Sequence, residues 1–219
     1  MKAMMYADWL NFRQSLRSML LILVVFAFAA FAWSGPMFFI MIVVMLSIML
    51  PATLCASDQA YGWDKLSLSL PILRREVVGS KYLIGLLANL ALCALAAAMT
   101  VIYSAVDASV PLTENLLGLF CGDIISLLLM GLMLAITFKF GVEKSRYILI
   151  GVVWIPILVM AAIVKLDIIP GMVEAFDHGF NQLVAAPTCL PLAVSLLACL
   201  ALYVAFYAVS VHTYQQKEL

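Results

Sequence analysis

The chain has 219 residues, of which 66% are apolar and 11% are charged. Average soluble domains contain about 45 to 50% apolar and about 25% charged residues. Its 12 basic and 12 acidic residues are too few to cover the surface of a soluble fold, and a net charge of zero provides no basic field for nucleic acid. The composition therefore excludes a soluble monomer and predicts an all-α membrane protein.

Six apolar runs predict six transmembrane helices in a single domain over residues 1–219. About 20 helical residues cross a bilayer core that is about 30 Å thick. The runs are Met19 to Trp33, Met37 to Ala56, Tyr82 to Val106, Leu116 to Phe138, Tyr147 to Val164 and Cys189 to Val211. The first is short, with 15 residues, and only Ser34-Gly35-Pro36 separates it from the second, which predicts a tight helical hairpin.

The residues before the first run predict an interfacial helix. Its apolar side chains share an arc of about 80° on a helix: Met5, Trp9, Phe12, Leu16 and Met19. We expect it to lie along the inner leaflet, either as an anchor alone or as a contact for a partner. A cleaved signal peptide is the competing interpretation, because Ala30-Phe31-Ala32 resembles a cleavage site, but another span follows instead of an exported domain.

The basic residues predict the orientation of the spans. With a cytoplasmic amino terminus, 11 of the 12 basic residues fall in inner segments, and only Lys165 lies outside. This asymmetry follows the positive-inside rule. We therefore expect a multi-pass protein of the cell membrane with both its amino and its carboxyl terminus in the cytoplasm.

Two segments between the spans carry further signals. Residues 166–188 predict an extracellular amphipathic segment before the sixth helix, which Ile169-Pro170-Gly171 starts and Pro187 ends.

Residues 57–81, between the second and third helices, are longer than the usual connection of about 2 to 8 residues. We expect a short element from Trp63 to Leu70 and a helix from Pro71 that continues into the third span. Such a charged and partly apolar surface is typical of a docking site, the alternative being that its basic residues only anchor the helix end.

The motifs of catalysis and nucleotide binding are missing. The sequence contains no Gly-x-x-x-x-Gly-Lys-Ser/Thr, His-Glu-x-x-His or Gly-x-Ser-x-Gly. Cys121-Gly122-Asp123 matches only part of an intramembrane aspartyl protease motif. We expect no catalytic residue, no metal site and no cofactor in this chain.

Asp123 is an acidic residue about two turns into the fourth apolar run, where a carboxylate is costly. It either lines a substrate path or a subunit interface, or lies near the outer mouth and is simply solvated. Asn89 in the third run is a candidate for the same path or interface, although hydrogen bonding between helices explains it equally well.

The segment from Trp63 to Leu83 has the sequence WDKLSLSLPILRREVVGSKYL. It resembles the loop signature of small bacterial ABC-2-type permeases, in which Leu-Pro-Ile, a charged pair, two β-branched residues and Lys-Tyr follow one another. The close match covers these 21 residues, and the rest of the chain is similar only in architecture.

The resemblance implies a non-catalytic permease subunit of an ATP-binding-cassette exporter. Such a subunit pairs with a second copy or a similar permease, and a separate cytoplasmic ATPase holds ATP and Mg²⁺. The loop at 57–81 would couple the ATPase to the permease. It would contact the ATPase through Trp63, Asp64, Lys65, Leu66, Leu70, Pro71, Arg74, Arg75, Glu76 and Lys81. The family is associated with export of amphipathic and antimicrobial peptides.

Two other functions stay open at this point. An ion-coupled carrier or channel would use Asp123 as its coupling acid, although carriers usually place several ionisable groups near the midplane. A membrane immunity or scaffold protein would only sequester a toxin.

Overall fold

The computed structural model describes residues 19–29, 35–60, 74–106, 112–165 and 190–216. These ranges are helical apart from short connections. The helices are Met19–Ala29, α2 (Pro36–Ala60), α4 (Arg74–Val106), α5 (Leu112–Phe140), α6 (Val142–Lys165) and α8 (Leu190–Gln215). The expected all-α architecture is therefore confirmed, and five of these helices are long and apolar enough to cross a membrane.

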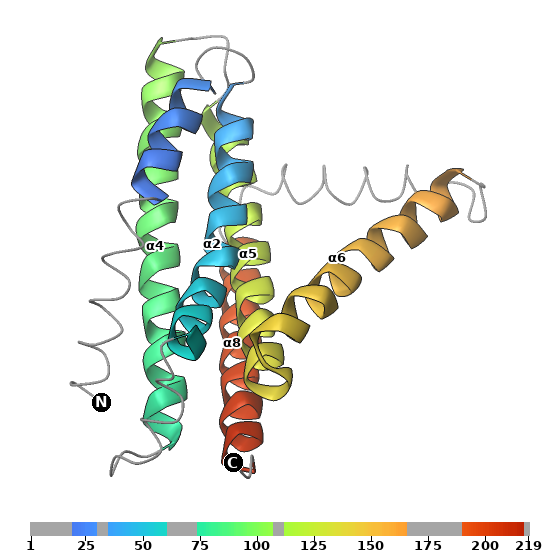
Figure 1. Cartoon of the computed structure of the whole chain (residues 1–219). Helices are drawn as coiled ribbons and strands as arrows, with labels where there is room; N and C mark the ends of the chain where they lie inside the picture. The colour runs from blue at the N-terminus through green and yellow to red at the C-terminus, as the bar shows by residue number, and fades with distance from the viewer. Residues whose placement is uncertain (1–18, 30–34, 61–73, 107–111, 166–189, 217–219) are drawn as a thin grey trace.

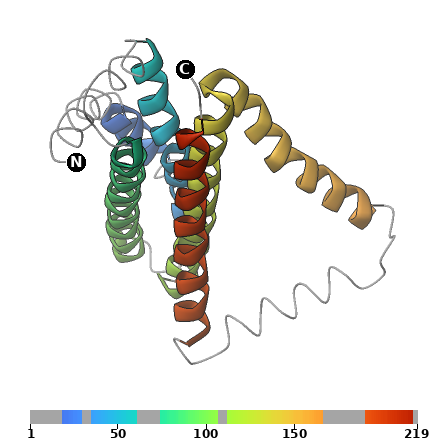
Figure 2. The ribbon, with the colours of Figure 1, turned by 90° about the horizontal axis from the view of Figure 1, so that it is seen from below.

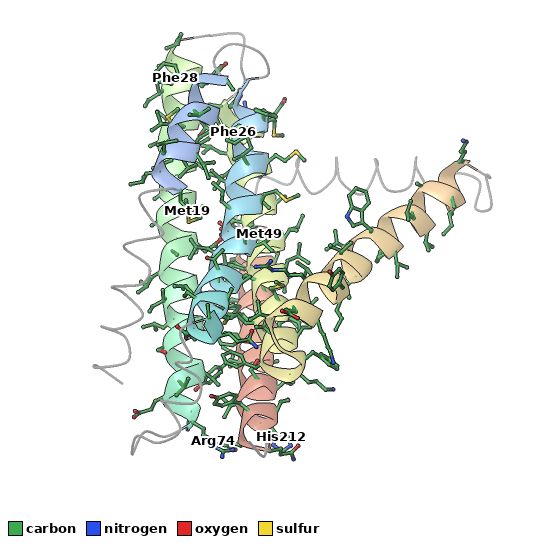
Figure 3. The ribbon with its side chains drawn as sticks, viewed as in Figure 1. Met19, Phe26, Phe28, Met49, Arg74 and His212 are labelled. Atoms are coloured by element: carbon green, nitrogen blue, oxygen red, sulfur yellow. The ribbon has the colours of Figure 1, made fainter. Side chains whose placement is uncertain are left out.

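The first expected span is only partly described. The Met19–Ala29 helix is shorter than the other five. Figure 3 places Phe28 at the end of the bundle that is far from Arg74, and Met19 about halfway along it. The described helix thus covers only one half of the bundle. The expected interfacial helix, the outer amphipathic segment at 166–188 and the Trp63 to Leu70 element lie outside the described residues.

α5 is the central helix of the bundle. It packs against α2, α4, α6 and α8, and its side chains Met130, Met133 and Leu134 are fully enclosed. α2, α4, α5 and α8 run side by side, whereas α6 leaves the bundle at a steep angle (Figures 1 and 2). Many α6 side chains are consequently exposed and apolar, including Trp154 at 56% and Leu158 at 62%. In a bilayer such faces contact lipid or other apolar helices.

The connection between α5 and α6 is a single residue. Gly141 has a positive φ of 87°, and its backbone nitrogen donates a hydrogen bond of 2.9 Å to the Thr137 carbonyl oxygen. A left-handed residue of this kind ends a helix, and glycine adopts it without steric cost. This glycine allows α6 to diverge immediately after α5 ends.

Candidate functional site

Most polar contacts between helices lie near the end of the bundle that carries Arg74 and His212, here called the Arg74 end (Figure 3). Asp58 in the last turn of α2 forms an ion pair with Lys81 of α4, and their side chains are only 3% and 5% exposed. The two residues flank the 61–73 connection. Their pairing fixes the helix before this connection directly to the helix after it.

Arg74 and Arg75 attach the first turn of α4 to α8. Arg74 Nη1 donates hydrogen bonds to the carbonyl oxygens of Tyr214 and Gln215, at 3.4 and 2.9 Å. These carbonyls belong to the last turn of α8, where the helix itself supplies no donor and the dipole favours a cation. Arg75 Nε donates a hydrogen bond of 3.3 Å to the Tyr207 hydroxyl. The start of α4 and the end of α8 are thereby held together.

Tyr82 joins three helices just inside this end. Its hydroxyl lies 3.1 Å from the Gly131 carbonyl oxygen on α5 and 2.7 Å from Ser210 Oγ on α8. The Tyr203 hydroxyl donates a hydrogen bond of 2.8 Å to the Tyr82 carbonyl oxygen. The Tyr82 ring also packs edge-on against Tyr203 and Tyr207, with centroids 5.2 and 5.4 Å away. We call Asp58, Arg74, Arg75, Lys81 and Tyr82 the anchor layer.

A second polar group, the central cluster, consists of Asn89, Asp123 and Ser126. Asn89 Nδ2 donates a hydrogen bond of 2.6 Å to Asp123 Oδ1, and Ser126 Oγ donates one of 2.9 Å to Asn89 Oδ1. Asn89 and Ser126 are buried, whereas Asp123 is half-buried. The hydrogen bonding between helices expected of Asn89 is therefore confirmed.

Asp123 lies deeper in the helix than in the apolar run, where it is about two turns from the start. α5 begins at Leu112, four residues before the apolar run, which places Asp123 about three turns, or about 16 Å, into the helix. Its partner Asn89 is near the middle of α4 (Arg74–Val106). The two interpretations of Asp123, a path or interface residue and a solvated carboxylate at the outer mouth, both stay predictions.

The match to known proteins extends over almost the whole chain. Residues 4–215 match the family described as ABC-2 family transporter protein, a stretch that contains both the anchor layer and the central cluster. The chain belongs to this family. No curated protein and no solved structure matches it. As an ABC-2 permease it is a multi-pass membrane component of a transporter and a non-catalytic subunit, and such permeases generally work with an ABC ATPase.

The expected contact residues of this ABC-2 permease divide into two groups. Those that lie outside the described residues are Trp63, Asp64, Lys65, Leu66, Leu70 and Pro71. Arg74, Arg75, Glu76 and Lys81 lie in the first turns of α4. Arg74 and Arg75 turn toward α8 of the same chain, and Lys81 is buried against Asp58. The structure gives Lys81 an internal contact and little surface for a partner.

Sequence reasoning missed two members of the anchor layer, Asp58 and Tyr82. Asp58 lies two residues after the end of an apolar run, and an acid in that position signals a nearby cation. Tyr82 was noted only as part of the Lys-Tyr pair. In the permease both residues of that pair are buried, Lys81 against α2 and Tyr82 against α5 and α8.

Within the described part of the permease, one cavity lies beside the anchor layer and another lies along α4. One of about 60 Å³ lies beside Lys81 and is lined also by Gln59, Thr137 and Tyr214. This space has both polar and apolar lining residues, and its volume suits about two water molecules. The other, of about 330 Å³, is lined by apolar residues of Met19–Ala29, α2 and α4, including Leu23, Leu50 and Leu92. Within the described ranges, no three His, Cys, Asp or Glu side chains converge on a metal-sized site.

Proposed function

We propose that this chain is the permease subunit of an ATP-binding-cassette exporter and that it acts as a dimer with a second copy or a similar permease. A separate cytoplasmic ABC ATPase binds and hydrolyses ATP with Mg²⁺, and the segment at 57–81 transmits its motion to the spans. Family membership supports this function. The observation that carries the coupling role is the ion pair between Asp58 and Lys81 across the connection.

The anchor layer provides a mechanical path for this coupling. A displacement of the connection at 61–73 acts on α2 and α4 together, because Asp58 and Lys81 tie the two helices. Tyr82 and Arg74 then pass the displacement to α5 and α8. Packed helices with fixed contacts move as rigid bodies, which suits the rocking motion of a transporter.

The distribution of charge supports a cytoplasmic location for the Arg74 end. The basic residues of this end are Arg74, Arg75, Lys81, Lys139, Lys144 and Arg146. Lys165 lies at the opposite end of α6. By the positive-inside rule, the end with the basic residues faces the cytoplasm. The 57–81 segment is then accessible to an ATPase.

An amphipathic molecule, such as an antimicrobial peptide, is the substrate that we propose. The apolar cavity of about 330 Å³ accommodates a hydrocarbon group. The central cluster adds polar groups at mid-height of the same bundle. A substrate with both apolar and polar parts matches this combination.

Co-purification tests the docking role. The wild-type permease, purified from its native cells in mild detergent, is expected to retain an ABC ATPase. Replacement of Trp63 and Leu66 by alanine is expected to lose it. The matched control replaces Trp154 and Leu158 of α6, which are exposed residues of the same types. Retention of the ATPase by the Trp63/Leu66 variant, or its loss from the control as well, would contradict the proposed docking site.

A further inference from the structure

The central cluster presents a carboxylate in a fixed orientation. Ser126 Oγ donates to Asn89 Oδ1, which directs the amide nitrogen of Asn89 toward Asp123. The Asp123 carbonyl oxygen lies 2.9 Å from the same Ser126 hydroxyl, so the two acceptors share its one proton. Asn89 and Ser126 are both buried and cannot turn away without losing these bonds. The cluster is therefore pre-organised around Asp123.

The charge of Asp123 has no counter-ion within the part of the chain that the structure describes. No described lysine, arginine or histidine forms an ion pair with it, and the titratable groups beside it are the thiols of Cys93 on α4 and Cys199 on α8. A carboxylate inside a membrane normally pairs with a cation or faces a polar path. Asp123 is also only half-buried, which leaves part of it accessible from outside the chain.

The surroundings of the cluster are apolar. Residues three positions apart share one face of a helix. Phe120 is three residues before Asp123 in α5, Leu86 is three before Asn89 in α4, and Leu196 is three before Cys199 in α8. All three side chains are half-buried. Binding sites for small molecules combine such apolar surfaces with a few fixed polar groups. Here the fixed polar group is a carboxyl group, whose ionised form attracts a cation.

We propose that Asp123 binds the ammonium or guanidinium group of an amphipathic cation, that Asn89 positions its carboxylate, and that neighbouring apolar side chains hold the hydrocarbon part. The inference rests on the proposed function, because it gives the exporter a substrate class. It narrows that class from amphipathic molecules to those with a positive charge. A carboxylate accepts hydrogen bonds from both cationic groups, and charge assistance makes these bonds the stronger kind.

Equilibrium binding of dodecylamine to the full-length permease in zwitterionic nanodiscs tests the proposal. Dodecanol is the neutral probe of equal chain length, and empty nanodiscs give the background from lipid partitioning. We expect saturable dodecylamine binding to the wild type, with affinity reduced about 10-fold by Asp123→Asn because the charge pair is lost. Asp123→Glu is expected to retain most of the affinity. Dodecanol binding should not differ between these proteins.

Two further variants complete the design. Glu114→Gln removes an exposed carboxylate from the first turn of the same helix and should leave dodecylamine binding unchanged. Asn89→Ala should weaken binding less than Asp123→Asn, because it removes only the positioning contact. Equal dodecylamine affinity of wild type and Asp123→Asn would overturn the proposal, as would an equal fall in dodecanol binding or a wild type without saturable binding.

The proposed function is tested independently of this site. Asp123→Asn should still co-purify with the ATPase, because Asp123 is far along α5 from the Arg74 end. Conversely, the Trp63/Leu66 variant should still bind dodecylamine. Loss of dodecylamine selectivity with ATPase retention intact therefore refutes only the cation site, and the reverse result refutes only the docking role.

Discussion

Asp58 and Lys81 form an ion pair between two helices that the chain connects through residues 61–73, and both side chains are almost completely buried. The ion pair holds together the two helices on either side of this connection, α2 and α4. Because both charges are buried, where water does not screen their attraction, the pair constrains the spacing of α2 and α4 more strongly than a surface pair would.

Removal of one member of this pair should destabilise the permease. Asp58→Asn or Lys81→Met is expected to reduce the free energy of unfolding by about 3 to 5 kcal/mol, because each leaves a buried charge. Thermal or denaturant unfolding in detergent, followed by circular dichroism, measures the change. The control variants Glu143→Gln and Lys144→Met remove exposed charges from α6 and should have effects below about 0.5 kcal/mol.

A double variant in which the two charges are exchanged gives a stricter test of the contact between Asp58 and Lys81. Asp58→Lys combined with Lys81→Asp should recover part of the stability lost by either single substitution, because opposite charges meet again. A double variant no more stable than the worse single variant would argue against direct pairing in the membrane.

The hydroxyl of Tyr82 should contribute measurably to the contact between α4, α5 and α8. Tyr82→Phe removes its interactions with the Gly131 carbonyl oxygen and Ser210 Oγ. We expect a loss of about 1 to 3 kcal/mol, since buried polar partners are left unsatisfied. Tyr147→Phe is the control, because Tyr147 is 77% exposed. Comparable unfolding midpoints for the two variants would contradict the role assigned to Tyr82.

Gly131 permits the close approach of α5 to α8. A Cβ atom at Gly131 would lie 2.9 Å from Tyr203 Cδ2 and 3.1 Å from Phe206 Cδ2. Gly131→Ala is therefore expected to destabilise the bundle by about 1 to 3 kcal/mol through overpacking. Gly151→Ala in α6 provides the control, since its Cβ would lie 3.8 Å from Ile155 Cδ1, an ordinary contact. Unfolding curves of both variants decide the prediction, and an equally stable Gly131→Ala would refute it.

Cysteine labelling tests the proposed orientation. In a variant whose native cysteines are replaced, Ser67→Cys should react with a membrane-impermeant maleimide only after the cells are opened. Lys165→Cys should react with intact cells. The result follows from the excess of basic residues at the Arg74 end. Labelling of Ser67→Cys in intact cells would place the 57–81 segment outside and exclude contact with a cytoplasmic ATPase.

The candidate site was only partly predictable from the sequence. The Trp63 to Leu83 signature pointed to the region around the anchor layer, and Asn89 and Asp123 were selected as polar residues within apolar runs. Their direct hydrogen bond was not predicted. Helix length was also underestimated for α5, because Thr113, Glu114 and Asn115 continue the helix beyond its apolar part. Apolar content marks the part of a helix that suits lipid and does not mark where its backbone hydrogen bonding ends.

The sequence by itself determined that this is a membrane protein. It also determined the approximate positions of the spans and the lack of a nucleotide-binding motif, since these depend on local composition and short motifs. Only the tertiary structure decided which residues meet: Asp58 with Lys81, Tyr82 with Gly131 and Ser210, and Asn89 with Asp123. The physical reason is that a helix in lipid is apolar on nearly every face. Its hydrophobic pattern therefore does not indicate which face packs inward, and close packing and polar pairs between helices select that face.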